Sequence, residues 1–129
     1  NLIEVVGKNI RAGYKDIRIF EIGKTYCRDE NGNACEADRL SIALMNGSDN
    51  PLAELVSIFQ NLDLGAGFKL IPSTAPNEVA NLFHPKRFVR VEKDGELIAG
   101  LAEAHLRVLN MLGIEKRVAV WEIDLENLI

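Results

Sequence analysis

The sequence predicts an α+β domain: an antiparallel sheet flanked by helices that pack on one of its faces. Two observations lead to this fold class. Asn31–Gly32 and Asp94–Gly95 are two-residue hairpin signals, and each stands between extended, apolar segments. The predicted elements also follow one another as helix, hairpin, helix, hairpin, helix, strand. That order lacks the repeating strand–helix–strand units that a parallel sheet requires.

Three helices are expected, because apolar residues recur there at a spacing of three or four. Their ranges are 1–14, 51–65 and 105–112. Gly13 is expected to stop the first helix. Asn50 and Pro51 supply a cap and a first turn for the second, which we expect to end near Gly65. The third helix is short and begins at His105.

The remaining apolar segments are expected to form strands. The predicted strands and hairpins cover residues 17–28, 39–47, 67–73, 87–104 and 117–129. The first is apolar on both alternating faces over residues 17–26, so we expect it to lie in the centre of the sheet. Helices on one face would leave its other face uncovered, which indicates a surface for a partner.

Bulk composition indicates one soluble globular domain over residues 1–129. The chain has 129 residues, of which 47% are hydrophobic and 26% are charged. Its net charge of −4 gives no global positive field for nucleic acid. The scattered Lys and Arg residues predict at most weak binding of nucleic acid. No apolar run is long enough to span a membrane.

The cellular compartment and the chain's context can also be inferred. Two cysteines are too few for a disulfide scaffold, and no signal peptide pattern opens the chain. We therefore expect a reducing, cytoplasmic environment. The chain starts at Asn1, inside a helical pattern and without an initiator Met, so we expect it to be a segment of a longer polypeptide.

Glu21 interrupts an otherwise apolar strand. A buried carboxylate is costly unless a cation or several hydrogen-bond donors meet it. The sequence offers Arg11 on the preceding helix and Arg87 after the long loop. A catalytic carboxylate would need a second acid or base nearby, and no motif supplies one. We therefore predict that Glu21 is a buried structural acid that fixes the sheet's register.

The potential metal ligands form no recognisable site. Seven residues separate Cys27 from Cys35, whereas a zinc knuckle places two to four residues between its thiolates. His84 precedes a proline at a loop end, where a hydrogen-bonding anchor is the usual role, and His105 should bond locally. A small hydrolase that uses His84 and an acid is a remote alternative, because no motif supports it.

Three stretches of the sequence form a recognisable series. They are "NIRAGYKDIRIFEIGKTY" (9–26), "FHPKRFVRVEKDGELIAGLAEAHLRVLNMLGI" (83–114) and "VAVWEIDLENLI" (118–129). In this order they resemble the bacterial β chain of phenylalanyl-tRNA synthetase. Their order and spacing agree with that family over most of the chain, whereas residues 48–82 match only as a helix and a variable loop. Lys86 stands where the family usually has glycine, so we expect a changed loop conformation there. Ala102, Ala104 and Leu106 also depart from the family's usual residues.

The resemblance implies a class II aminoacyl-tRNA synthetase fold in a non-catalytic copy. In that family the α chain carries the ATP and phenylalanine sites, so this chain is expected to bind no cofactor or metal. ATP and Mg²⁺ are implied only for the whole enzyme. The implied partner is the α subunit, while other parts of the complex would contact tRNA(Phe). A free-standing synthetase-like paralogue with a ligand-binding or regulatory role remains the alternative.

Residues within the family-like stretches are candidates for structural or interface roles, and none is a catalytic candidate. These candidates are Arg11, Phe20, Glu21, Gly23, His84, Arg87 and Gly100.

Overall fold

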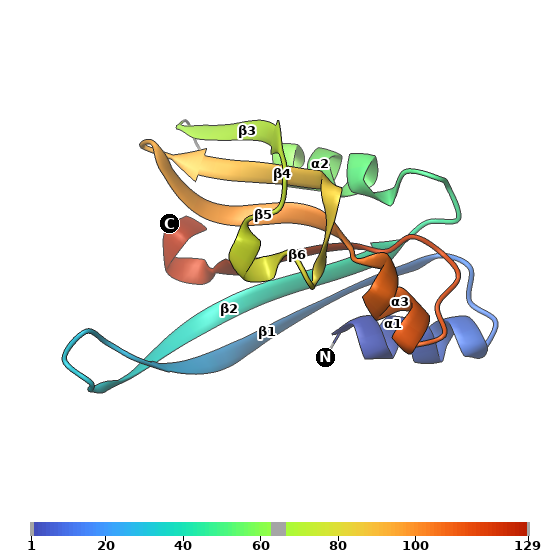
Figure 1. Ribbon diagram of the computed structural model, residues 1–129, viewed down its shortest axis with the longest axis horizontal. Helices are drawn as coiled ribbons and strands as arrows, with labels where there is room; N and C mark the ends of the chain where they lie inside the picture. Colours follow the sequence, from blue (N-terminus) through green and yellow to red (C-terminus); the bar gives the residue numbers. More distant parts are fainter. Residues whose placement is uncertain (1, 63–66, 129) are drawn as a thin grey trace.

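A computed structural model describes residues 2–62 and 67–128 of the chain. Its centre is a six-stranded antiparallel sheet with the strand order β1-β2-β6-β5-β4-β3 (Figure 1). The strands are β1 (Ile17–Arg28), β2 (Ala34–Met45), β3 (Phe68–Ser73), β4 (Phe83–Lys93), β5 (Glu96–Ala104) and β6 (Ala119–Asp124). The α-helices are α1 (Leu2–Arg11), α2 (Pro51–Asn61) and α3 (Leu106–Met111), and two short 3-10 helices are η1 (Asn77–Val79) and η2 (Leu125–Leu128). The α+β class and the antiparallel sheet are therefore confirmed.

Both predicted hairpin turns are present, and each has the backbone that its glycine allows. Gly32 has φ +79° at the β1–β2 turn, where the Asp29 carboxylate accepts hydrogen bonds from two backbone N–H groups of the loop. Asp94 and Gly95 both have positive φ between β4 and β5, as a two-residue turn of the favoured hand requires. The local turn chemistry therefore fixes the two hairpins.

The helix signals were accurate at α2 and approximate elsewhere. The Asn50 side chain accepts a hydrogen bond from the N–H of Ala53 at 3.3 Å, and Pro51 is the first helical residue. This helix ends at Asn61; the expected end at Gly65 lies outside the described residues. The first helix ends at Arg11. The third is one residue shorter at each end than expected, because His105 and Leu112 are its caps.

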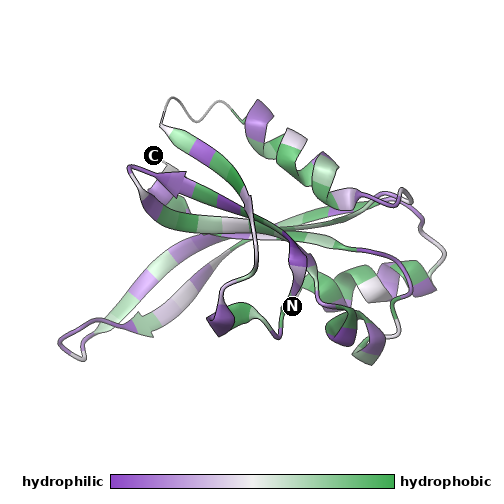
Figure 2. Ribbon diagram, turned by 45° about the horizontal axis from the view of Figure 1, so that its top comes forward, coloured by the Kyte–Doolittle hydropathy of each residue, from purple (hydrophilic) through white to green (hydrophobic). Residues whose placement is uncertain are grey.

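Helices cover both faces of the sheet, so the prediction of helices on one face was wrong. On one face, α1 and α3 pack against a cluster that includes Ala43, Val120 and Ala104. On the other, α2 packs with Leu55 and Phe59 against a second cluster. That cluster includes Leu44, Leu101 and Trp121. Figure 2 shows this as hydrophobic residues on the central strands and on the helix sides that meet them.

The first strand lies at the edge of the sheet, so its predicted central position was also wrong. Only β2 pairs with β1, and β2 in turn pairs with β6 through Arg39–Leu44. A strand with apolar residues on both faces can be central, or it can be an edge strand that exposes them. Phe20, Ile22 and Tyr26 show the second outcome, with exposed fractions of 70%, 60% and 74%.

An ion pair ties this edge strand to α2. Arg18 donates two hydrogen bonds to the Glu54 carboxylate, at 2.6 and 2.7 Å. The hydrogen bond from Arg18 lowers the pKa of Glu54 below its ordinary value, and that carboxylate raises the pKa of Arg18. The next residues that point to the same side of β1, Phe20 and Ile22, lie beyond this contact.

Gly100 gives a testable packing constraint. A Cβ atom at this position would lie 2.4 Å from the Phe88 ring, whereas one at Gly23 would have its nearest neighbour 3.9 Å away. We expect Gly100→Ala to destabilise the domain by about 1–3 kcal/mol, because the ring must leave its place over β5. Urea unfolding would measure the change.

Gly23→Ala is the matched control and should change the free energy of unfolding by no more than about 0.5 kcal/mol. Equal unfolding midpoints for Gly100→Ala and the unmodified chain would contradict the packing seen at Gly100.

Candidate functional site

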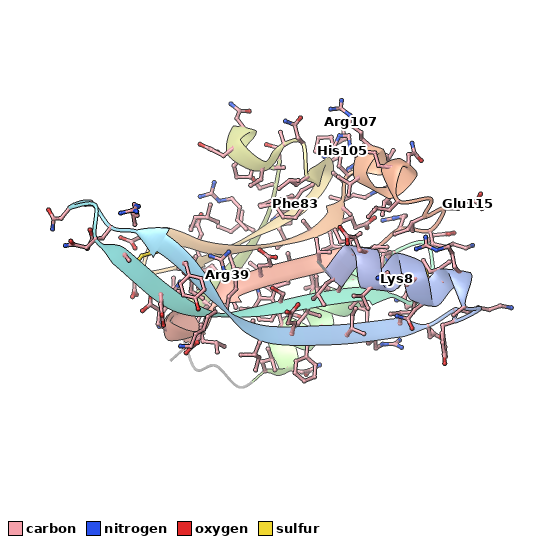
Figure 3. All side chains as sticks on the ribbon, turned by 90° about the horizontal axis from the view of Figure 1, so that it is seen from below. Lys8, Arg39, Phe83, His105, Arg107 and Glu115 are labelled. Atoms are coloured by element: carbon pink, nitrogen blue, oxygen red, sulfur yellow. A yellow bond between two sulfur atoms is a disulfide. The ribbon has the colours of Figure 1, made fainter. Side chains whose placement is uncertain are left out.

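The candidate site is a shallow depression on the sheet face that α1 and α3 only partly cover. It consists of two adjoining hollows of ≈ 380 and ≈ 360 Å³, and Phe83 and Glu122 line both. The first hollow lies over β5 and β6 and beside η1, and the second extends to the start of α1. In Figure 3, this face of the sheet carries Arg39 and Phe83.

The polar lining of this depression is mostly acidic. Arg39 pairs with Asp124 at 3.0 Å and with Glu122 at 3.8 Å. Glu78 and Glu21 add further carboxylates at the two ends. Over both hollows, Arg39 is the one cation among the described lining residues, against four carboxylates. This balance favours neutral or cationic groups over the phosphates of a nucleotide.

Glu21 borders this depression and is exposed, so the prediction of a buried acid was wrong. Neither predicted partner reaches it in the described structure. Arg11 donates to the carbonyl of Leu112 at 3.3 Å, and Arg87 pairs with Glu103. The physical reason is the edge position of β1, which leaves its carboxylates in water and removes the need for a cation.

The buried acid of this fold is Glu103 on β5, which is 1% exposed. Arg117 donates to both of its oxygens, through Nε at 2.6 Å and through Nη2. Arg87 adds a third hydrogen bond at 3.4 Å. The carboxylate raises the pKa of Arg117 through these hydrogen bonds. Glu103 is thus the ionic anchor that the sequence argument assigned to Glu21.

A sequence signal for Glu103 existed and was missed. Glu103 lies between two alanines in the strand segment "LAEA", so the adjacent residues offer its carboxylate no polar side chain. Its strand is also bordered by partners on both sides, β4 and β6. The same rule that drew attention to Glu21, a carboxylate within an apolar strand, applies with more force here.

Both histidines act as local hydrogen-bond anchors, as expected. His84 Nδ1 accepts from the N–H of Lys86 at 3.1 Å, and His105 Nδ1 accepts from the N–H of Arg107 at 3.0 Å. Burial lowers the pKa of His84, and the positive charge of Arg87 lowers it further. A neutral imidazole that already accepts a backbone hydrogen bond suits an anchoring role.

Exposed apolar side chains of β1 form a second candidate surface, which we call the β1 strip. It consists of Phe20, Ile22 and Tyr26, whose positions alternate onto the face of the sheet that carries α2. Gly23 is half-buried between them on the strand, and its side of the sheet is the opposite one. The strip lies on the edge strand itself, whose outer backbone groups have no neighbouring strand within the described residues.

Comparisons with known proteins agree on one family. The profile described as "Phenylalanyl tRNA synthetase beta chain CLM domain" matches residues 1–125. The chain belongs to this family. The match extends over nearly all of the described fold, including the depression and the β1 strip.

Relatives within the family are distant but match along the whole chain. The phenylalanine–tRNA ligase β subunit of Syntrophus aciditrophicus is 27% identical over 98% of this chain. That of Thermotoga maritima is 28% identical, also over 98%. In both cases the match spans 17% of the relative, so this chain corresponds to about a sixth of each of those subunits.

A solved structure shares the fold. The pyrrolysyl-tRNA synthetase PylSc of Desulfitobacterium hafniense superposes with a TM-score of 0.75 over 99% of this chain and 45% of its own. Sequence identity is 20%, so this similarity shows the fold alone.

Lys86, a departure from the family's usual glycine, needs no unusual backbone. Among the described non-glycine residues only Asp94 has positive φ, so Lys86 adopts an ordinary conformation. Whether the loop differs from that of relatives with glycine at this position stays a prediction. Gly100, by contrast, lies under the Phe88 ring, where a side chain has no room.

Glu103 and Glu21 make a matched pair for testing which acid is structural. Glu103→Ala leaves two guanidinium groups without their anion and should cost about 3–5 kcal/mol of unfolding free energy. Glu103→Gln should cost less, because the amide still accepts hydrogen bonds. Glu21→Ala should stay within about 0.5 kcal/mol of the unmodified chain.

Urea unfolding of the three variants, followed by far-ultraviolet circular dichroism, would measure these differences. A larger loss for Glu21→Ala than for Glu103→Ala would refute this assignment of the structural acid.

Proposed function

We propose that this chain is a catalytically silent, class II synthetase-like module of a phenylalanine–tRNA ligase β subunit. The observation that carries the proposal is the family match over residues 1–125. In this proposal the module supports an α subunit, which binds ATP and Mg²⁺ and attaches phenylalanine to tRNA(Phe). Other parts of the complex make most of the tRNA contacts, and the setting is the cytoplasm.

The charge of the depression supports catalytic silence. Formation of an aminoacyl adenylate requires the ATP phosphates to be held by cations or by preorganised N–H donors. Here the lining carboxylates outnumber Arg39, and that guanidinium is already engaged with Asp124 and Glu122. A polyanionic ligand would meet net repulsion on this face.

The β1 strip supports a partner role. Phe20, Ile22 and Tyr26 are large apolar side chains on one face of an edge strand, the face of the sheet that carries α2. A partner that removes such side chains from water gains binding free energy, because burial of each large apolar side chain contributes about 1.5–3 kcal/mol. We propose that the α subunit covers the β1 strip.

A ligand-binding, regulatory paralogue is the second candidate function. The two hollows support it, because their volumes of ≈ 380 and ≈ 360 Å³ lie within the range of small-molecule sites. Calorimetric titration of the chain with phenylalanine and with ATP would distinguish the candidates. Binding of either ligand favours the paralogue, whereas the absence of heat favours the silent module.

Catalytic silence predicts no adenylate chemistry. The chain alone should give no phenylalanine-dependent exchange of pyrophosphate into ATP, because Arg39, the one cation among the described lining residues, is already paired with carboxylates. A radiolabelled exchange assay with and without phenylalanine measures this, with a complete phenylalanine–tRNA ligase as the positive control. Amino-acid-dependent exchange by the pure chain would overturn the assignment.

The partner role predicts a localised effect on assembly. Phe20→Lys and Ile22→Lys in the full-length β subunit should each weaken association with the α subunit by at least about tenfold, which is 1.4 kcal/mol. Sedimentation velocity at several concentrations would measure it. Each variant should keep its fold, since charged residues are common on exposed edge strands.

Met111→Lys is the matched control. Met111 is 79% exposed and lies on α3, which packs on the face of the sheet opposite to the β1 strip. Two results would contradict the proposed position of the interface. The two β1 variants could associate with the α subunit as tightly as the unmodified subunit does, or Met111→Lys could weaken association as much as they do. Neither result would bear on catalytic silence.

A further inference from the structure

The end of the β1–β2 hairpin extends beyond the rest of the sheet (Figure 1). The next strand, β6, pairs with β2 only from Arg39 onward, so residues 24–28 and 34–38 pair only with each other. We call these two segments and the turn between them the hairpin arm. A two-stranded ribbon is marginally stable in water unless something else holds it.

Apart from the pairing of its two strands and local hydrogen bonds within the hairpin, few noncovalent contacts hold the arm. Lys24 forms ion pairs with Glu36 at 3.4 Å and Asp38 at 3.5 Å, and more than half of each of these side chains is exposed. Pairs of this kind contribute little. Tyr26 is 74% exposed, and neither hydrophobic core cluster includes a residue of the arm.

A disulfide bond crosses the arm. Cys27 and Cys35 are directly opposite each other in the strand register and are joined by this bond, which Figure 3 shows near the end of the hairpin. Cys27 is exposed and Cys35 is partly buried. The bond is therefore accessible to small thiols at one of its two sulfur atoms.

We propose that Cys27 and Cys35 form a reversible thiol–disulfide site that controls the order of the hairpin arm. The co-reactant is a low-molecular-weight monothiol of the glutathione class and its disulfide. With the bond formed, the arm is a fixed ribbon. With the bond reduced, the arm frays as far as Arg39, where pairing with β6 begins.

The exchange is balanced in two steps. The thiolate of one small thiol attacks the exposed Cys27 sulfur, forms a mixed disulfide and releases Cys35 as a thiolate, which takes up a proton. A second small thiolate then attacks the sulfur of the small molecule in this mixed disulfide, which releases Cys27 as a thiol. The protein gains two electrons and two protons, and one molecule of the small disulfide forms.

Reduction is expected to act locally. The sheet from Arg39 to Leu44 keeps its pairing with β6, and both core clusters lie outside the arm. The bond closes a short loop, and such cross-links stabilise mainly by limiting the unfolded state of the segment that they close. The arm alone should therefore lose protection against hydrogen exchange.

The test uses the full-length protein equilibrated in glutathione buffers over a range of ratios. Trapping of free thiols should show two thiols appearing together as the ratio of squared thiol to disulfide concentration rises. Hydrogen–deuterium exchange should then be at least about tenfold faster in residues 24–28 and 34–38 of the reduced protein. Exchange in residues 39–44 should be unchanged.

A Cys27→Ser/Cys35→Ser variant is the control. The arm of this variant should exchange hydrogen at the rate of the reduced protein, in oxidising and in reducing glutathione buffers alike. Three results would each overturn the proposal: two free thiols at every ratio, a bond that persists in a large excess of reduced glutathione, or equal exchange of the arm in the oxidised and reduced proteins.

Discussion

Burial of the end of β5 (residues 101–104) and the start of β6 (residues 119–121) on both faces is the constraint on which the rest of this fold depends. The two strands lie inside the sheet, with α2 on one side and α1 and α3 on the other. Each strand must therefore carry apolar residues at consecutive positions, as "VAVW" does before and within β6. A charge at such a position requires its own cations, which Arg117 and Arg87 supply to Glu103. That ion cluster ties β5 to the segments on either side of it.

The same constraint explains where polar and apolar groups remain exposed. The helices cover one end of the sheet, and the open part of the α1 side holds Arg39 and its carboxylates. At the far edge, β1 has β2 as a neighbour on one side only, so its apolar residues face water. An acidic depression and an apolar edge on one small domain fit a module that supports a partner better than one that binds a nucleotide.

Local features of the fold could be predicted from the sequence, and the order of the strands could not. Short segments determine the turns at Gly32 and Gly95 and the Asn50 cap, because each depends on residues only a few positions apart. The position of β1 depends on the pairing of β2 with β6, about 80 residues away in sequence. Apolar residues on both faces are compatible with a central strand and with an exposed edge strand. The wrong choice between these two positions made Glu21 appear buried.

Trp121 has a practical consequence for observing this molecule. It is the single tryptophan of the chain, 1% exposed, with its ring 5.2 Å from that of Phe59. Its fluorescence should therefore report solvent entry between β6 and α2. The hairpin arm and the β1 strip lie outside that contact, so events there should leave the emission spectrum unchanged. Tryptophan fluorescence from this domain thus reports on its core and does not respond to changes at the hairpin arm or the β1 strip.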